Sequence, residues 1–85
     1  MTREEIAEVN QEALVCDGFD EAIIGMAERL GLGPVVAYNV EKMIAIMIER
    51  DGMTYEEALE YYNFNILGAW MGEFTPIFIT TGIEQ

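Results

Sequence analysis

Three carboxylates stand close together around a glycine near the start of the chain, at Asp17, Asp20 and Glu21. Carboxylate oxygens are the ligands that hard cations such as Ca²⁺ and Mg²⁺ prefer. The spacing does not match an EF-hand loop, which places its acids at alternate positions and ends on a glutamate. The cluster therefore leaves two interpretations open: a divalent-cation site, or a polar turn that carries solvated charge.

A second polar group flanks an apolar stretch nearer the C-terminus, where Asn63 and Glu73 lie on either side of Trp70. Amide side chains within an apolar helix are costly to bury without hydrogen-bond partners. Asn63 either satisfies backbone groups or lines a small pocket with Tyr38, Trp70 and Glu73. Such a pocket could stack a nucleobase and bond its edge. Without basic residues, a phosphate there would have to rest on backbone amides.

The third candidate is the acidic surface itself. Its carboxylates recur in two rows, Glu4, Glu8 and Glu12, and then Glu56, Glu57 and Glu60. With 16 acidic residues, 4 basic residues and no histidine, the formal net charge is −12. This charge opposes contact with nucleic acid and leaves a basic macromolecular surface or a cation as partner. The rows are either merely solvated or imitate the charge of a nucleic-acid backbone, with these predicted partner contacts: Glu8, Glu12, Glu56, Glu57 and Glu60.

The composition excludes several kinds of catalytic site. Without histidine or serine, neither a Ser-His-Asp triad nor a Cys-His dyad can form, and a zinc site built from Cys and His is excluded as well. Cys16 is the single cysteine, so no disulfide forms within the chain, which fits a reducing cytoplasm. Its apolar neighbours favour a small buried hydrophobe over a nucleophile. We therefore expect a protein that is not an enzyme and uses no cofactor.

The first half of the sequence predicts a helix followed by strands. Thr2 and Glu5 form a capping box for a helix over 2–13, whose apolar stripe is Ile6, Val9 and Ala13. Short strands are then expected at 14–16, 19–27 and 35–38, with a break at the Gly- and Pro-rich stretch 31–34.

The second half predicts two helices and a strand. Asn39 is the expected N-cap of a helix over 40–50 that Gly52 ends, and this helix is apolar on most sides, which is typical of a buried helix. Thr54 and Glu57 form a second capping box. The inner face of the helix that follows is predicted to comprise Tyr55, Ala58, Leu59, Tyr62, Ile66 and Trp70. A final strand is expected over 75–80, and Pro76 near its start indicates an edge position or the entry to the strand.

This order of elements predicts one α+β domain over residues 1–85, with an N-terminal helix (1–13) and a core (14–85). The core is expected to be a small, mostly antiparallel sheet of three to four strands, covered on one face by two helices. Hydrophobic residues make up 52% of the chain, which argues against disorder. That apolar surplus is either a dense core or a surface for a homodimer. No run is long enough to span a membrane, and the acidic N-terminus is unlike a signal peptide, so a cytoplasmic protein without a membrane partner is expected.

Three strings stand out in this sequence: DGFDEA at 17–22, RDGMTYEEA at 50–58 and GAWMGE at 68–73, followed by Thr75 and Pro76. Together they resemble a family of small bacteriophage and bacterial proteins to which no activity is assigned. The resemblance covers about residues 13–80. It implies a phage or prophage context and action inside a bacterial host cell, where small acidic phage proteins often act on host machinery or host defence.

The sequence therefore predicts a non-enzymatic, acidic, phage-type protein that occupies a basic, nucleic-acid-binding surface of a host protein. An inhibitor of a defence system, similar in effect to an anti-CRISPR protein, is one such role. The alternatives are a protein that sequesters a nucleotide or another small molecule, with Tyr38, Asn63, Trp70 and Glu73 at the site, and a homo-oligomeric assembly subunit. Direct binding of nucleic acid is not expected, because the helix that opens with Glu56 and Glu57 carries no Arg or Lys.

Overall fold

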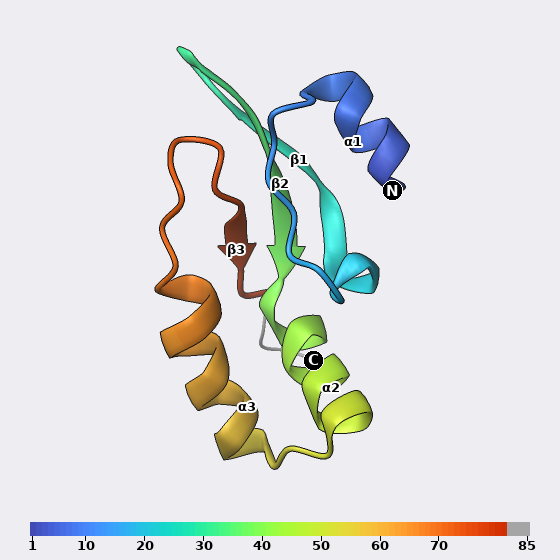
Figure 1. Ribbon diagram of the computed structural model, residues 1–85, viewed down its shortest axis with the longest axis vertical. Coiled ribbons are helices and arrows are strands. Elements are labelled where there is room, and N and C mark those ends of the chain that lie inside the picture. Colours follow the sequence, from blue (N-terminus) through green and yellow to red (C-terminus); the bar gives the residue numbers. More distant parts are fainter. Residues whose placement is uncertain (82–85) are drawn as a thin grey trace.

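A computed structural model describes residues 1–81 of the chain and combines helices with one three-stranded sheet (Figure 1). In chain order the elements are α1 (Arg3–Val9), η1 (Asp20–Ala22), β1 (Ile23–Arg29), β2 (Leu32–Asn39), α2 (Val40–Asp51), α3 (Tyr55–Tyr61), η2 (Tyr62–Leu67) and β3 (Ile77–Ile79). The predicted α+β class and N-terminal helix are confirmed. Residues 82–85 of the predicted core lie outside the described part of the chain. No helix within residues 1–81 is long and apolar enough to cross a bilayer.

The sheet has the order β1-β2-β3 and is mixed. β1 and β2 form an antiparallel hairpin, whereas β3 pairs with β2 in parallel, from Ala37 opposite Ile77 to Asn39 opposite Ile79. Both expectations for Pro76 are confirmed, because β3 has β2 as its neighbour on one side only and Pro76 directly precedes this strand. In Figure 1, α2 and α3 lie beside each other at the end of the sheet from which β2 runs directly into α2.

Two predictions for the region before β2 are wrong. The expected break over 31–34 is only a two-residue turn at Leu30 and Gly31, because Gly31 has a φ of 86° and lets the hairpin close tightly. The expected strand over 14–16 does not form. Its backbone amides bond elsewhere: Leu14 N–H donates to the carbonyl of Phe74 (3.2 Å), and Cys16 N–H donates to Tyr38 Oη (2.7 Å). The strand expected over 19–27 is confirmed from Ile23 onward, after the short helix η1.

The helices begin where their capping residues predict. The boxes of Thr2 with Glu5 and of Thr54 with Glu57 are both complete, and Asn39 Oδ1 accepts the Lys42 N–H (2.8 Å). At the other end of α2, the left-handed conformation of Gly52 stops the helix.

The N-terminal helix is shorter than predicted, because α1 ends at Val9 and not near Ala13. The next residue, Asn10, has an extended backbone, and its side-chain Nδ2 donates to the carbonyl of Pro34 (2.8 Å). The spacing of apolar residues within a helix cannot predict a hydrogen bond to a strand 24 residues further along the chain. Because of this early end, Glu12 does not share a helix face with Glu4 and Glu8 as the sequence suggested.

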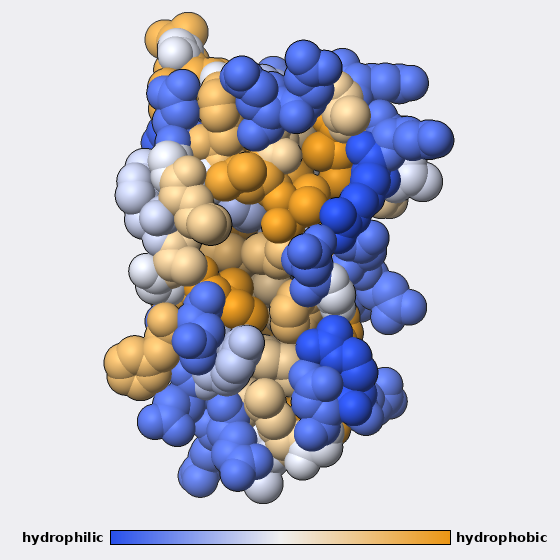
Figure 2. Space-filling model, in the orientation of Figure 1, coloured by the Kyte–Doolittle hydropathy of each residue, from blue (hydrophilic) through white to orange (hydrophobic). Residues whose placement is uncertain are grey.

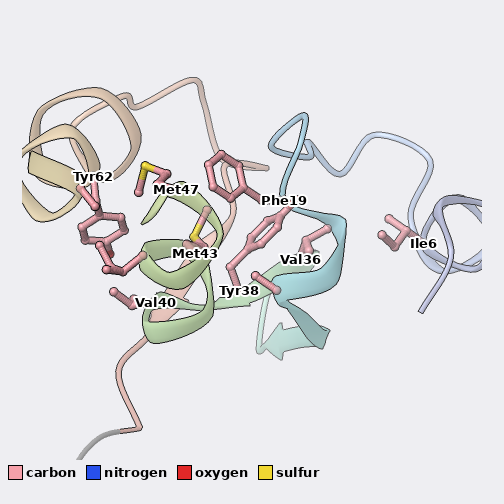
Figure 3. Packing of buried hydrophobic residues seen from close by; sticks show 11 residues of the cluster. Ile6, Phe19, Val36, Tyr38, Val40, Met43, Met47 and Tyr62 are labelled. Carbon is pink, nitrogen blue, oxygen red and sulfur yellow. The ribbon is translucent and has the colours of Figure 1, made fainter. Parts of the chain in front are cut away.

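The core is one cluster around β2 and α2, in which Tyr38 and Met43 are fully buried (Figure 3). The ring of Phe78 stacks on Tyr38 at 6.0 Å between centroids and meets Tyr62 edge-on at 5.7 Å. The composition of α2 suggested a helix that is buried on every side, but one side of it is exposed. It buries Val40, Met43, Ile44 and Met47, while Ala45 and Ile48 stay exposed.

The C-terminal helix changes its winding before it ends. α3 continues directly into η2, a π-helical segment that ends at Leu67 before Gly68. Of the predicted inner face, Ala58 and Tyr62 are buried and Leu59 and Ile66 pack against the cluster. Tyr55 and Trp70 are 61% and 75% exposed, so their assignment to the inner face is wrong. Tyr55 lies in the first turn, beyond the reach of the core, and Trp70 lies past the end of the helix.

Candidate binding surface

The predicted acidic contacts are all exposed, but they form two groups at opposite ends of the molecule. Glu8 lies on α1 and Glu12 just after it, whereas Glu56, Glu57 and Glu60 lie on α3. Figure 1 places α1 and α3 at the two ends of the longest axis, along which the molecule measures 38 Å. A partner that touches both groups must therefore span most of the molecule.

The two groups also differ in how free their side chains are. Glu57 Oε1 accepts the Thr54 N–H at 2.9 Å in the capping box. Glu56 and Glu60 lie one helical turn apart and form no salt bridge within residues 1–81, and the same holds for Glu8 and Glu12. Four of the five predicted contacts can thus meet a basic partner without breaking a bond in the fold.

The carboxylate cluster of the sequence is engaged by an arginine of the same chain. The Arg3 guanidinium lies 3.1 Å from Asp17 and 3.0 Å from Asp20, and the hydrogen bonds to Asp20 and then Asp17 raise the pKa of Arg3. Glu21 does not join them. Within residues 1–81, no three side chains of ligating type converge where they could hold a metal ion. These ion pairs therefore link α1 to the turn at Asp17 and to the first residue of η1, and they partly neutralise the charge of the cluster.

A second arginine is tied down in the same way. Arg50 forms a bidentate pair with Asp51 (2.8 Å for Nη2), which lowers the pKa of Asp51, and it donates to the carbonyl of Gly18 at 2.7 Å. Its guanidinium carbon also lies 5.0 Å from the centre of the Phe19 ring. Since two of the chain's four basic side chains are held by its own acids, few cations remain to offset the negative surface.

Apolar side chains are exposed between the two acidic ends. Figure 2 shows an apolar centre on one face, with hydrophilic side chains gathered at both ends and along the side of α1 and α2. Four large apolar side chains are exposed on η2 and the loop after it, with exposed fractions of 75% for Phe64, 54% for Leu67, 75% for Trp70 and 72% for Met71. Of these side chains, the sequence had placed only Trp70 on the inner face of the last helix, and it made no prediction for Phe64, Leu67 and Met71. The sequence offered Gly68 or Gly72 as the end of this helix, and the structure ends it at Leu67 before Gly68, so Trp70 and Met71 lie in the loop.

A groove of about 590 Å³ lies between the end of the β1–β2 hairpin and the loop that follows η2. The hairpin contributes Glu28, Arg29 and Leu32, and the loop contributes Trp70 and Glu73. Of the four residues predicted to form a small-molecule pocket, the structure therefore brings two together, Trp70 and Glu73.

The other two residues of the predicted pocket lie elsewhere. Tyr38 is fully buried in the core, where its Oη accepts the Cys16 N–H. Asn63 is exposed on η2 and does not line the groove. The pocket predicted from Tyr38, Asn63, Trp70 and Glu73 is therefore wrong in this form, because the buried tyrosine faces the core and the helix turns the asparagine toward solvent.

The buried hydroxyl of Tyr38 leads to a prediction about alkaline stability. Burial raises the pKa of Tyr38 from 10.0 to about 12, and the hydrogen bond from Cys16 only partly offsets this. Because the folded pKa lies above the unfolded one, this stabilisation is complete below pH 10 and is lost as the pH rises toward about 12. Urea unfolding across this range should show falling stability.

The matched variant for this prediction is Tyr38→Phe, which should flatten the alkaline fall and lower stability at neutral pH by about 1–3 kcal/mol, since the Cys16 N–H loses its partner. Burial also raises the pKa of Tyr62, so Tyr62→Phe should remove a further part of the fall. A slope that is the same in Tyr38→Phe and in the unaltered protein contradicts the prediction.

No protein-family model, no curated protein and no solved structure matches this chain.

Proposed function

We propose that this protein is a non-enzymatic binding protein that occupies a basic, nucleic-acid-binding surface of a host protein. The observation that carries the proposal is the exposure of every acidic side chain within residues 1–81, in a chain of formal net charge −12 whose Arg3 and Arg50 are already paired with acids of the same chain. A surface of this kind attracts a basic partner over distances of about a Debye length and repels polyanions.

The arrangement of apolar and acidic side chains supports a protein partner in particular. Protein interfaces combine an apolar centre with a polar rim, and the face in Figure 2 has this layout. A second copy of the chain would match the apolar centre but would bring another 12 negative charges to the contact, which like-charge repulsion opposes. A basic partner can cover the apolar centre and also pair its cations with the acidic ends.

The titratable groups also support binding over catalysis. A general acid or base works best with a pKa near the operating pH. Burial raises the pKa values of Cys16 and Tyr38, and the pair with Arg50 lowers that of Asp51, so each shift leads away from neutrality. These groups are poorly suited to proton transfer at physiological pH.

The host and its location follow from the resemblance to phage proteins alone. If the chain acts inside an infected bacterial cell, the basic grooves of nucleic-acid-binding defence proteins offer the required complementarity, and a CRISPR effector is one such target. In that role the chain acts as an inhibitor that mimics nucleic acid, and its acids accept hydrogen bonds from the target's Arg and Lys side chains.

The experiment uses the full chain immobilised on beads, with bacterial lysate as the source of partner. We expect a captured nucleic-acid-binding protein that a rising salt step releases and that added DNA or RNA displaces, because the chain and the nucleic acid compete for one surface. Beads that carry an unrelated acidic protein of similar charge remove proteins that bind any polyanion. A captured partner whose affinity is the same at low and physiological ionic strength, or that holds nucleic acid and this chain together, refutes the proposal.

One observation favours a second candidate, a protein that sequesters a small molecule, because Trp70 and Glu73 do share a groove. A nucleotide is poorly matched to this groove, since a phosphate would meet two carboxylates and one guanidinium. A thermal shift caused by one class of nucleotide would favour this candidate over the protein partner.

A further inference from the structure

The groove beside Trp70 has the size of a specific site. Its volume of about 590 Å³ falls in the range of ordinary ligand pockets, roughly 300–1,000 Å³. Leu32, Leu67 and Ile77 give it apolar walls, and these side chains are 38%, 54% and 42% exposed. The groove therefore offers apolar surface that remains in contact with water in the isolated chain.

Trp70 is the largest side chain of the groove and the chain's single tryptophan. At 75% exposure its ring lies in water, although tryptophan is among the residues that most often dominate binding energy at interfaces. An indole face is also the best aromatic partner for a guanidinium or ammonium group.

The charges of the groove select a cation over an anion. Its charged side chains are Glu28, Arg29 and Glu73, so the carboxylates outnumber the single guanidinium. They lie within the field of a strongly negative molecule, which adds to the attraction for a positive group. A cation with an apolar body can stack on Trp70, pair with Glu28 or Glu73, and cover the leucines.

The loop that carries Trp70 is held in place before any ligand binds. Thr75 Oγ1 accepts the Met71 N–H at 2.8 Å and donates to the Gly72 carbonyl at 2.7 Å, which closes a tight turn. The Phe74 ring packs against Gly33 so closely that a Cβ on this glycine would lie 2.9 Å from it. A site that is ordered in advance loses less entropy when it binds.

We infer that this groove is the anchor site for an arginine side chain, flanked by apolar residues, on a segment of the basic partner. The inference rests on the proposed function for the partner's identity as a basic protein. The arginine stacks its guanidinium on Trp70, pairs with Glu28 and Glu73, and places its apolar neighbours against Leu32, Leu67 and Ile77.

Trp70 also provides the measurement, because tryptophan emission shifts to shorter wavelength when a ligand excludes water from the indole. The probe is a short capped peptide with an arginine between two leucines, titrated into the full chain at physiological salt. We expect a saturable blue shift with this peptide. The same peptide with the neutral isostere citrulline in place of arginine should bind about tenfold more weakly, since it loses the cation–π contact and the ion pair. ATP should produce no shift.

Three variants separate the groove from the overall charge. The double variant Glu28→Gln with Glu73→Gln should weaken the arginine peptide about tenfold, whereas Arg29→Gln should tighten it, because a competing cation is removed. The matched control is Glu21→Gln with Glu49→Gln, which removes the same charge from a second hollow of about 590 Å³ beside α2. That control should leave the peptide affinity unchanged.

Equal binding of the arginine and citrulline peptides overturns the inference, as does a blue shift with ATP that Arg29→Gln abolishes or a failure of the arginine peptide to bind. The proposed function is tested separately by the capture experiment. If the peptide does not bind but capture remains salt-sensitive and is displaced by nucleic acid, the anchor site is wrong and the proposed function stands. If the peptide binds as expected but nucleic acid does not compete for the captured protein, the groove does bind arginine and the proposed function is wrong.

Discussion

Replacing Met43 by alanine is expected to lower the free energy of unfolding by about 2–5 kcal/mol. Met43 has no exposed surface and lies among Tyr38, Met47 and Phe19 at the centre of the cluster (Figure 3). Its removal loses the burial of the side chain and leaves a cavity that its neighbours only partly fill. Small domains are stable by only about 5–15 kcal/mol in total, so the loss should be visible in both urea and thermal unfolding.

Ile48 provides the control on the same helix, because it is 37% exposed and lies on the side of α2 that the core does not cover. Ile48→Ala should cost clearly less than Met43→Ala, close to the roughly ±0.5 kcal/mol of surface substitutions. Comparable losses for the two variants would mean that the outer side of α2 is covered in solution, as it would be in a homodimer. Light scattering over a dilution series then decides that point.

Neutralising four acids, Glu8, Glu12, Glu56 and Glu60, with glutamine should slow association with the captured partner by about 10–100-fold at low ionic strength. Electrostatic steering raises association rates by roughly 10–1,000-fold, and it acts through the summed field and not through single contacts. Glu57 is left unchanged because its side chain completes the capping box of α3. Stopped-flow kinetics at several salt concentrations provide the measurement.

The same experiment carries its own control, since the rates of the variant and the unaltered chain should converge at high salt, where the charges are screened. Because the two acidic groups lie at opposite ends of the molecule, the pairs Glu8 with Glu12 and Glu56 with Glu60 can also be neutralised separately. Unequal effects identify the end that faces the partner. If the fourfold variant associates as fast as the unaltered chain at low salt, the acidic ends play no part in recognition.

The parts of the fold that could be predicted are those that depend on neighbouring residues. Thr2, Asn39 and Thr54 each bond a backbone amide three residues ahead, and Gly52 adopts a left-handed conformation that few other residues tolerate. Such signals are complete within a few positions of the sequence, so helix starts and the end of α2 were predicted closely.

The parts that could not be predicted depend on residues far apart in the sequence. α1 ends before Asn10, whose side chain forms a hydrogen bond with the carbonyl of Pro34. The strand predicted at Leu14 does not form, because the Leu14 N–H donates to the carbonyl of Phe74. Local propensity favours a longer helix and a strand there, and tertiary hydrogen bonds override it. The carboxylate cluster follows the same rule, since nothing in its spacing indicates that Arg3 will occupy it.

The position of Trp70 was missed for a reason of geometry. The inner face was predicted with the regular α-helical period, whereas η2 is wound as a π-helix, which adds a residue to the turn. That extra residue rotates the later side chains about the helix axis, and the helix then ends at Leu67, so Trp70 leaves the core and lines the groove. Trp70, which was expected in the core, is therefore exposed in the groove, where a partner can contact it.

The parallel pairing of β3 with β2 has a consequence for the order of folding. Tyr38 and Phe78 can meet only after the long stretch of chain that contains α2, α3 and the following loop has folded back on β2. Closing this stretch costs conformational entropy, and the short strand β3, of three residues, offers few strand contacts to offset that cost. The β1–β2 hairpin and the α2–α3 pair involve shorter loops, so they should form earlier and β3 should dock last. Hydrogen exchange should accordingly find β3 opening before the rest of the sheet. Since Ile77 and Phe78 also line the groove, the wall of the proposed anchor site is the last part of the protein to be completed.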